Sequence, residues 1–251
     1  MGHWYDKSGK ACHTIRKGVV VRDTTLRDAR ALNLVPSVSE VLSIIAKPAL
    51  ENWKQDQSMM AALTLSRAIG EDDATYLARV RHDGRRQAQE AANEGTRIHS
   101  AVEKWFLGQS VPAEYWPHVS ATRDALQGIF PDVHDWVSEK SFAHPLGFGG
   151  CSDLHSPSTG IVVDFKSTDK KRDSDKRLHY DQNYQLAAYQ RGLNLIENDG
   201  AYDCANIFIS RTEPGTVFTH IWRTEDIAQG WRVFEAALRL WKAVKGYTGE
   251  W

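Results

Sequence analysis

The chain has 251 residues, a formal net charge of −1 at pH 7, 41% hydrophobic residues and 25% charged residues. This length is enough for a large α/β domain, or for a core with a smaller satellite domain, which we favour. No apolar run approaches the ~18 residues of a membrane-spanning helix, so we expect no membrane role. The near-zero charge excludes a globally polybasic protein, although local basic clusters can still bind a polyanion.

The cysteine content argues against a cysteine-built site. Cys12, Cys151 and Cys204 are scattered along the chain and form no CxxC motif. Three thiols cannot make a disulfide framework, a four-cysteine zinc site or an iron–sulfur cluster within one chain, so free thiols are expected. The N-terminal stretch MGHWYDKSGK lacks the apolar core of a secretion signal, which predicts a cytoplasmic protein.

The first half of the chain has mainly helical patterning. Residues 1–36 show weak periodicity, with a short strand predicted at 18–22. A helix is predicted to begin after Ser37, which would be its N-cap, with Glu40 as the capping-box partner. Further helices are expected over about 49–68, 73–107 and 120–129.

The pattern changes to strands near Val137. Strands are predicted over about 137–143, 149–154, 160–166, 205–211 and 216–222, with helices over 180–195 and 224–244. This order predicts an α/β fold with a mixed central sheet of about five strands flanked by helices, and an N-terminal helical region. We place the boundary between the regions 1–93 and 94–251.

Two acidic residues are predicted to meet at the end of a strand. In the stretch GIVVDFKSTDKK, Asp164 and Lys166 are two apart and share one strand face. A hairpin through the turn SPSTG puts Asp153 opposite residue 163 or 164. Two adjacent carboxylates repel unless one is protonated or a cation lies between them, and oxygen ligands suit Mg²⁺ or Mn²⁺. The alternative is a structural ion-pair cluster.

Two further pairs lie at helical spacing. His99 and Glu103 are four residues apart in one predicted helix, and Gln185 and Tyr189 are four apart in another, so each pair faces one direction. His99 is a candidate imidazole ligand, although a lone histidine is more often a core or surface residue. Gln185 and Tyr189 are candidates to reach a substrate backbone.

Basic residues form two clusters that are candidates for contacts with phosphate. The first is in the long helix and the second follows the strand 160–166; the candidates are Arg79, Arg81, Arg85, Arg86, Lys170 and Lys171. The alternative for each cluster is a solvated charged face.

The segments GTRIH, GGCSD, VVDFKST and QLAAY, in this order, resemble the motif series of the PD-(D/E)xK nuclease superfamily, within its RecB-like and lambda-exonuclease-like branch. The resemblance runs from Glu94 to Tyr189 by motif and to Trp222 by element order. It implies a restriction-endonuclease-like core at 94–251, with the helical region 1–93 forming one wall of a DNA passage.

The resemblance also implies roles for individual residues. The implied metal ligands, for one or two Mg²⁺ or Mn²⁺ ions, are His99, Asp153, Asp164 and the backbone carbonyl of Phe165, with Glu139 as a weaker candidate. Lys166 matches the catalytic lysine, while Gln185 and Tyr189 match the QxxxY motif that orients the lysine and contacts DNA.

From these features we expect a metal-dependent DNA exonuclease of phage or prophage type. It would hydrolyse phosphodiester bonds of single- or double-stranded DNA with ends, in recombination or DNA processing in the cytoplasm of a bacterial host. A single-strand-annealing or recombination protein is a candidate partner. The alternatives are a structure-specific or restriction-type endonuclease, a non-catalytic DNA-binding protein of the same fold, and an unrelated metal hydrolase of small phosphoesters.

Overall fold

The computed structural model describes residues 3–169, 181–195 and 202–248. The chain divides into two compact units, one made of Met1–Ile45 with Ala101–Trp251 and the other of Ala46–Ser100. This division differs from the boundary expected between residues 93 and 94. The N-terminal segment belongs with the sheet because Trp4, Leu34 and Val38 are buried in the same core cluster as Phe234 and Trp241.

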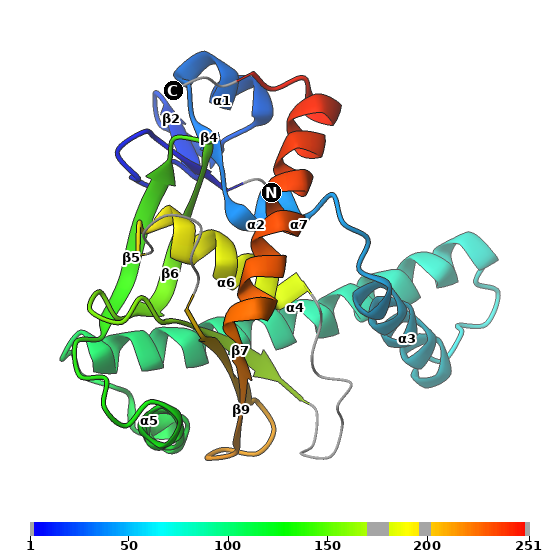
Figure 1. Cartoon of the computed structure of the whole chain (residues 1–251). Helices are drawn as coiled ribbons and strands as arrows, with labels where there is room; N and C mark the ends of the chain where they lie inside the picture. Colours follow the sequence, from blue (N-terminus) through cyan, green and yellow to red (C-terminus); the bar gives the residue numbers. More distant parts are fainter. Residues whose placement is uncertain (1–2, 170–180, 196–201, 249–251) are drawn as a thin grey trace. The chain divides into compact units, whose positions relative to one another are not determined.

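The larger unit contains a mixed five-stranded sheet, which confirms the expected architecture (Figure 1). Its strands lie in the order β5 (Val137–His144), β6 (Phe148–His155), β7 (Val162–Thr168), β8 (Cys204–Ser210) and β9 (Val217–Trp222). Neighbouring strands are antiparallel except β7 and β8, which are parallel. A parallel pair needs a crossover connection, and the helix α6 (Asp181–Gly192) lies in that connection.

The burial of the strands follows their position in the sheet. All seven residues of the strand β8 are buried, as expected for a central strand covered on both faces. In β7 the first four residues are buried and the last three are only half-buried. The polar end of β7 therefore lies where the core gives way to solvent.

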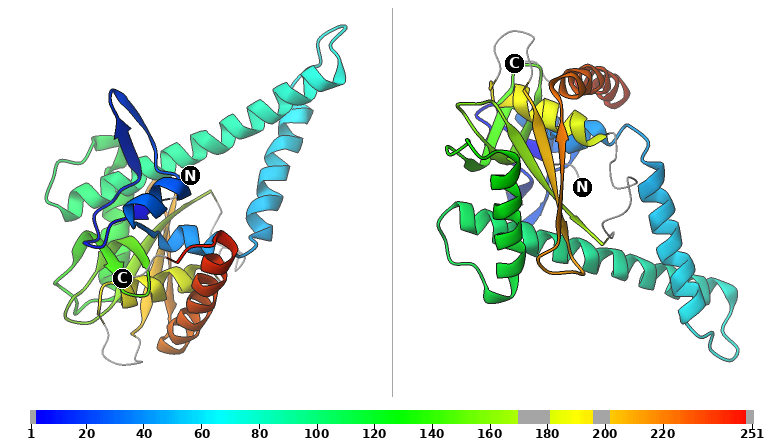
Figure 2. Two further views of the ribbon diagram at one scale, coloured as in Figure 1. Left: turned by 90° about the horizontal axis from the view of Figure 1, so that it is seen from above. Right: turned by 60° about the horizontal axis from the view of Figure 1, so that its bottom comes forward.

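Helices cover the sheet on its two faces. The helix α6 packs against β6 and β7, and it also packs against α7 (Thr224–Lys245), beside which it lies (Figure 2). Lys166 bonds to Gln185 of α6, whereas the neighbouring Phe165 stacks on Phe106, so alternate side chains of β7 reach opposite faces. The helix α5 (Trp116–Ile129), preceded by the 3₁₀ turn η1 (Ala113–Tyr115), packs against β8 and β9.

Residues 3–45 contain more secondary structure than the sequence pattern predicts. They contain β1 (Trp4–Tyr5), β2 (Thr14–Lys17), β3 (Val20–Asp23), α1 (Leu26–Leu32), β4 (Val35–Pro36) and α2 (Val38–Leu42). Ser37 caps α2 by accepting the backbone N–H of Glu40, as predicted, but its own backbone N–H donates to the carbonyl of His3, so the reciprocal bond of the predicted capping box is not formed. Strands of two residues carry too little pattern to be recognised in a sequence, and β1 and β4 form only by pairing with each other.

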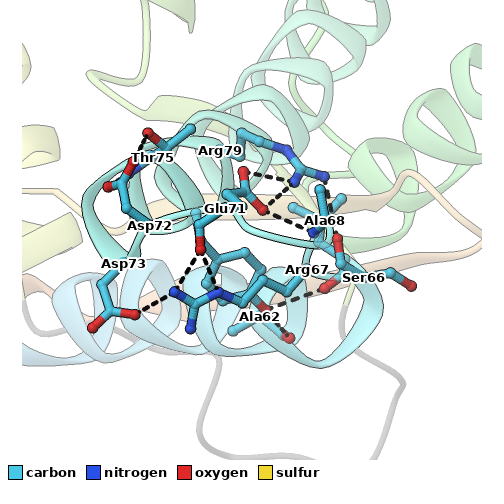
Figure 3. Close-up of polar contacts among 11 residues, drawn as sticks. Ala62, Ser66, Arg67, Ala68, Glu71, Asp72, Asp73, Thr75 and Arg79 are labelled. Atoms are coloured by element: carbon cyan, nitrogen blue, oxygen red, sulfur yellow. Dashed lines mark hydrogen bonds and ion pairs between the residues drawn. The ribbon is translucent and has the colours of Figure 1, made fainter.

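The smaller unit contains α3 (Pro48–Thr64) and the first part of α4 (Asp73–Phe106). The helices approach closely at Gly84, where an added Cβ would lie 3.2 Å from Ser58. Polar contacts fix the connecting loop (Figure 3): Arg79 donates two hydrogen bonds to the Glu71 carboxylate, and Arg67 donates to the Glu71 carbonyl. No helix in the described ranges has the length and apolar character needed to cross a bilayer.

Candidate active site

The sheet brings Asp153 and Asp164 together. The pairs Leu154↔Val163 and His155↔Val162 put Asp153 opposite Asp164 at the next step of the register, in agreement with the hairpin prediction. At that step the Oδ2 atom of Asp153 accepts the backbone N–H of Phe165 at 2.8 Å. The Asp153 side chain thus replaces a backbone hydrogen-bond acceptor for β7 where the regular β6–β7 pairing ends.

The two carboxylates repel one another. Burial raises the pKa of the Asp153 carboxyl well above its ordinary value, and the charge of Asp164 raises that pKa further, while Lys166 opposes the shift. A carboxyl that is desolvated beside a second carboxylate favours its neutral form unless a cation compensates. The pair therefore has the electrostatic character of a cation site.

Asp164 is held by donors on two sides. Its side chain is 4% exposed, and Lys166 Nζ lies 3.0 Å from its Oδ1 and 2.8 Å from its Oδ2. From the neighbouring strand β8, the Nδ2 atom of Asn206 donates to Asp164 Oδ2 at 2.8 Å. A buried carboxylate with charged and neutral donors on its oxygens is fixed in orientation.

A relay joins Lys166 to the helix α6. Lys166 Nζ donates to Gln185 Oε1 at 3.0 Å, and Gln185 Nε2 donates to the Tyr189 hydroxyl oxygen at 2.7 Å. Because an ammonium only donates, it fixes which end of the Gln185 amide faces it. Burial raises the pKa of Tyr189 well above its ordinary value, and the charges of Asp164 and Asp153 add to the shift. Tyr189 therefore stays protonated, and its hydroxyl can donate a hydrogen bond while it accepts one from Gln185.

Gly150 explains part of the GGCSD segment. A Cβ at this position would lie 2.9 Å from Cε1 of Tyr189 and 2.9 Å from Cζ of Phe142. Any larger residue would have to displace one of these rings. The glycine thus permits the tyrosine of the relay to lie directly against β6.

Glu139 lies on the other side of Asp153. The pairs Ser138↔Leu154 and Lys140↔Ser152 place Glu139 opposite Asp153, and Glu139 has a left-handed backbone with φ of 53°. A non-glycine residue in this region within a strand marks a local irregularity of the ladder. Desolvation raises the pKa of the Glu139 carboxyl, and the charge of Glu103 adds to the shift.

The register therefore makes a polar row across all five strands. From β5 to β9, its members are Glu139, Asp153, Asp164, Asn206 and His220. The motif pattern of the sequence does not single out Asn206. The signal that could have found it is a single amide in the otherwise apolar strand CANIFIS, because a buried amide requires a hydrogen-bond partner.

The predicted metal ligands are placed in part. Among residues 3–169, 181–195 and 202–248, no group of three or more histidine, cysteine, aspartate or glutamate side chains has the arrangement of a metal site. Asp153 and Asp164 are adjacent and have suitable oxygen donors, and their crowding is what a divalent cation would relieve. His99 lies on α4, in the smaller unit. The ligand roles of His99, Glu139 and the Phe165 carbonyl stay predictions.

The predicted phosphate contacts differ among themselves. Arg79 pairs with Glu71, and Arg86 pairs with Asp83 and Glu90 of its own helix. Arg81 and Arg85 are exposed, and neither makes an ion pair with another residue in the part of the chain that the structure describes. Lys170 and Lys171 lie outside the described residues.

Comparison with known proteins gives no family. No family model matches the chain, and no curated protein matches it. A solved structure described as "Crystal structure of SSO0001" aligns with 76% of this chain and 86% of its own chain, at 14% identity and a TM-score of 0.34. A similarity of that size says nothing about the fold or the function of this chain.

Proposed function

We propose that the protein is a metal-dependent DNA nuclease with a PD-(D/E)xK, restriction-endonuclease-like core, acting as an exonuclease. The observation that carries the proposal is the adjacency of Asp153 and Asp164, with Lys166 bonded to Asp164 on the same strand face. The order of the motifs along the chain agrees with this arrangement. A phage-type role in recombination or DNA processing, in the cytoplasm of a bacterial host, is part of the proposal.

A divalent ion, Mg²⁺ or Mn²⁺, would be held by Asp153 and Asp164 and would supply Lewis-acid activation of a phosphodiester. The protein's own contribution lies in Lys166. Its side chain is 30% exposed, so its ammonium can reach solvent and substrate while bonded to Asp164 and Gln185. At Nζ it can orient a water and neutralise charge that develops on a phosphate oxygen.

The relay through Gln185 limits the positions of Lys166. Gln185 is itself bonded to Tyr189, which is buried against Gly150, so the lysine is tied to a packed part of the fold. A catalytic group that is fixed before the reaction needs no reorganisation during it. This arrangement supports a catalytic role for the site over a merely structural ion pair.

The test is degradation of end-labelled linear DNA, single- and double-stranded, with Mg²⁺, Mn²⁺ or EDTA, with closed circular DNA alongside. We expect metal-dependent release of nucleotides from linear DNA, with circles left intact. Cutting of circles would favour the endonuclease alternative. DNA binding without cleavage in either metal would contradict the catalytic proposal and favour a non-catalytic DNA-binding protein.

A further inference from the structure

A second chain of hydrogen bonds reaches Asp164 from the neighbouring strand β8. The indole Nε1 of Trp222 donates to Asn206 Oδ1 at 2.7 Å, and Asn206 Nδ2 donates to Asp164 Oδ2 at 2.8 Å. The three residues come from the neighbouring strands β9, β8 and β7. Asn206 is fully buried and Trp222 is 6% exposed, so water does not compete for these bonds.

The Trp222 indole and the Asp164 carboxylate fix the orientation of the Asn206 amide between them. An indole N–H can only donate, so the Asn206 atom that faces Trp222 must be the carbonyl oxygen. The amide nitrogen is then the atom that faces Asp164, where it can only donate. The direction of the relay thus follows from the residue types as well as from the distances.

We propose that Asn206 and Trp222 are positioning residues for Asp164, holding its carboxylate in the orientation that binds a divalent cation. The inference rests on the proposed function, because it assigns Asp164 to a cation site. Hydrogen bonds to a metal-ligating carboxylate orient it, and removing such partners typically reduces metal affinity or activity by about 10- to 100-fold.

Packing alone does not account for this arrangement. Asn206 occurs in the strand CANIFIS, where an apolar residue would fill the space without burying an amide. Trp241 supplies the contrast: it is 1% exposed, and its Nε1 has no hydrogen-bond partner among the residues described. Trp222 therefore differs from the buried Trp241 because its indole N–H donates a hydrogen bond to Asn206.

The experiment compares Trp222→Phe with Trp241→Phe as a matched control. Each substitution removes a buried indole ring system and its N–H, but only the first removes a bond to Asn206. Mn²⁺ binding is measured by titration calorimetry on the full chain, together with thermal stability and the Mn²⁺ dependence of cleavage. We expect Trp222→Phe to weaken Mn²⁺ binding about 10-fold or more, and Trp241→Phe to leave it within about twofold, even where both variants lose stability.

The variant Asn206→Ala tests whether Trp222 acts on Asp164 through Asn206. Because Trp222 acts through Asn206, adding Trp222→Phe to Asn206→Ala should weaken Mn²⁺ binding no further. If Asn206→Ala does not fold, Trp222→Phe alone decides the question. Equal Mn²⁺ affinity in the wild type and Trp222→Phe would overturn the inference.

A metal-free readout separates this inference from the proposed function. The side-chain amide protons of Asn206, which are bonded to Asp164, should be strongly protected from exchange in wild type and in Trp241→Phe. They should be less protected in Trp222→Phe, where Asn206 Oδ1 loses its donor and the amide is free to turn away from Asp164. If the wild type neither binds Mn²⁺ nor cleaves DNA, the proposed function fails together with the cation role. The amide signals then still decide whether Trp222 orients Asn206; unchanged protection in Trp222→Phe would overturn that part as well.

Discussion

The charges of the sheet carboxylates are compensated differently from those of the arginines on the α3–α4 hairpin, the helix pair of the smaller unit. Asp164 is 4% exposed and has donors on two sides, whereas the Arg86 side chain is 52% exposed and pairs with carboxylates of its own helix. A buried charge is tolerated only with satisfied partners in good geometry, while an exposed ion pair is screened by solvent and contributes little to stability. The sheet carboxylates can therefore hold a fixed geometry, whereas the exposed arginines can attract an anionic partner.

This difference sets the expected response to substitution. Substitutions in the sheet region should change the cleavage rate or the stability by amounts that depend on the position. Substitutions on the hairpin should weaken DNA binding in proportion to the number of charges removed. The following predictions test the contrast, from the largest effect to the smallest.

The largest effect is expected for Lys166→Ala. It removes the only side chain shown bonded to both Asp164 and Gln185 in the described part of the chain, so cleavage should fall by about 10²- to 10⁴-fold. Initial rates on linear DNA with Mg²⁺ measure the loss. Lys140→Ala, an exposed lysine of β5, is the control and should cleave like wild type. A rate for Lys166→Ala within about threefold of wild type would remove the lysine from the mechanism.

Gly150→Ala should reduce both stability and cleavage. The added methyl group would lie 2.9 Å from Tyr189 and Phe142, and overpacking of this kind costs about 1 to 3 kcal/mol. Displacement of Tyr189 should also loosen Gln185 and lower the cleavage rate. Gly128→Ala is the control: it lies in α5 with nothing within 4 Å of an added Cβ, so it should stabilise slightly. Chemical denaturation gives the free energy of unfolding of both variants, and equal changes in Gly150→Ala and Gly128→Ala would contradict the close packing at Gly150.

Asp153→Asn should stabilise the metal-free protein at neutral pH. The folded-state pKa of Asp153 is raised above its ordinary value of 3.8, so the wild type loses stability as pH rises from that value through the folded pKa. Each unit of such a shift corresponds to about 1.4 kcal/mol at a pH above both values. Melting temperatures in EDTA should show the variant above wild type at pH 7 and the two converging in acid.

Asp135→Asn is the control of opposite sign. Hydrogen bonds from Ser156 and Ser158 hold the pKa of Asp135 below its ordinary value, so its charged form contributes stability that is lost as pH falls. This variant should be less stable than wild type at pH 7 and approach it in acid. If Asp153→Asn shows the same sign as Asp135→Asn, the two carboxylates of the site do not repel one another.

The smallest effect is expected on the hairpin. Arg81→Gln combined with Arg85→Gln should weaken DNA binding several-fold and reduce the salt dependence, by about 0.9 in log–log slope for each phosphate that the protein no longer neutralises. Arg123→Gln with Arg239→Gln removes the same charge from α5 and α7 and should leave the slope unchanged. Equal losses in the two double variants would show that net charge, and not this face of α4, is responsible.

Much of the larger unit could be predicted because its elements are long and strongly patterned. The predicted strand 149–154 lies within β6, and the predicted helix 224–244 differs from α7 by one residue. The hairpin turn SPSTG limited the partner of Asp153 to residue 163 or 164, and the register of the sheet decides for Asp164. The helix that begins after Ser37 was predicted, but β1 and β4 were not, because such short strands form through long-range pairing with each other.

The sequence by itself determined the order of the elements from Val137 onward, the shared face of Asp164 and Lys166, and the spacing of Gln185 and Tyr189, because these depend on local periodicity. Only the tertiary structure decided that the residue beside Asp164 on the next strand is Asn206, and that Trp222 fixes its amide. Parallel pairing across a crossover joins residues 42 positions apart, and no local pattern encodes its register. The orientation of the Asp164 carboxylate is therefore a property of the assembled sheet.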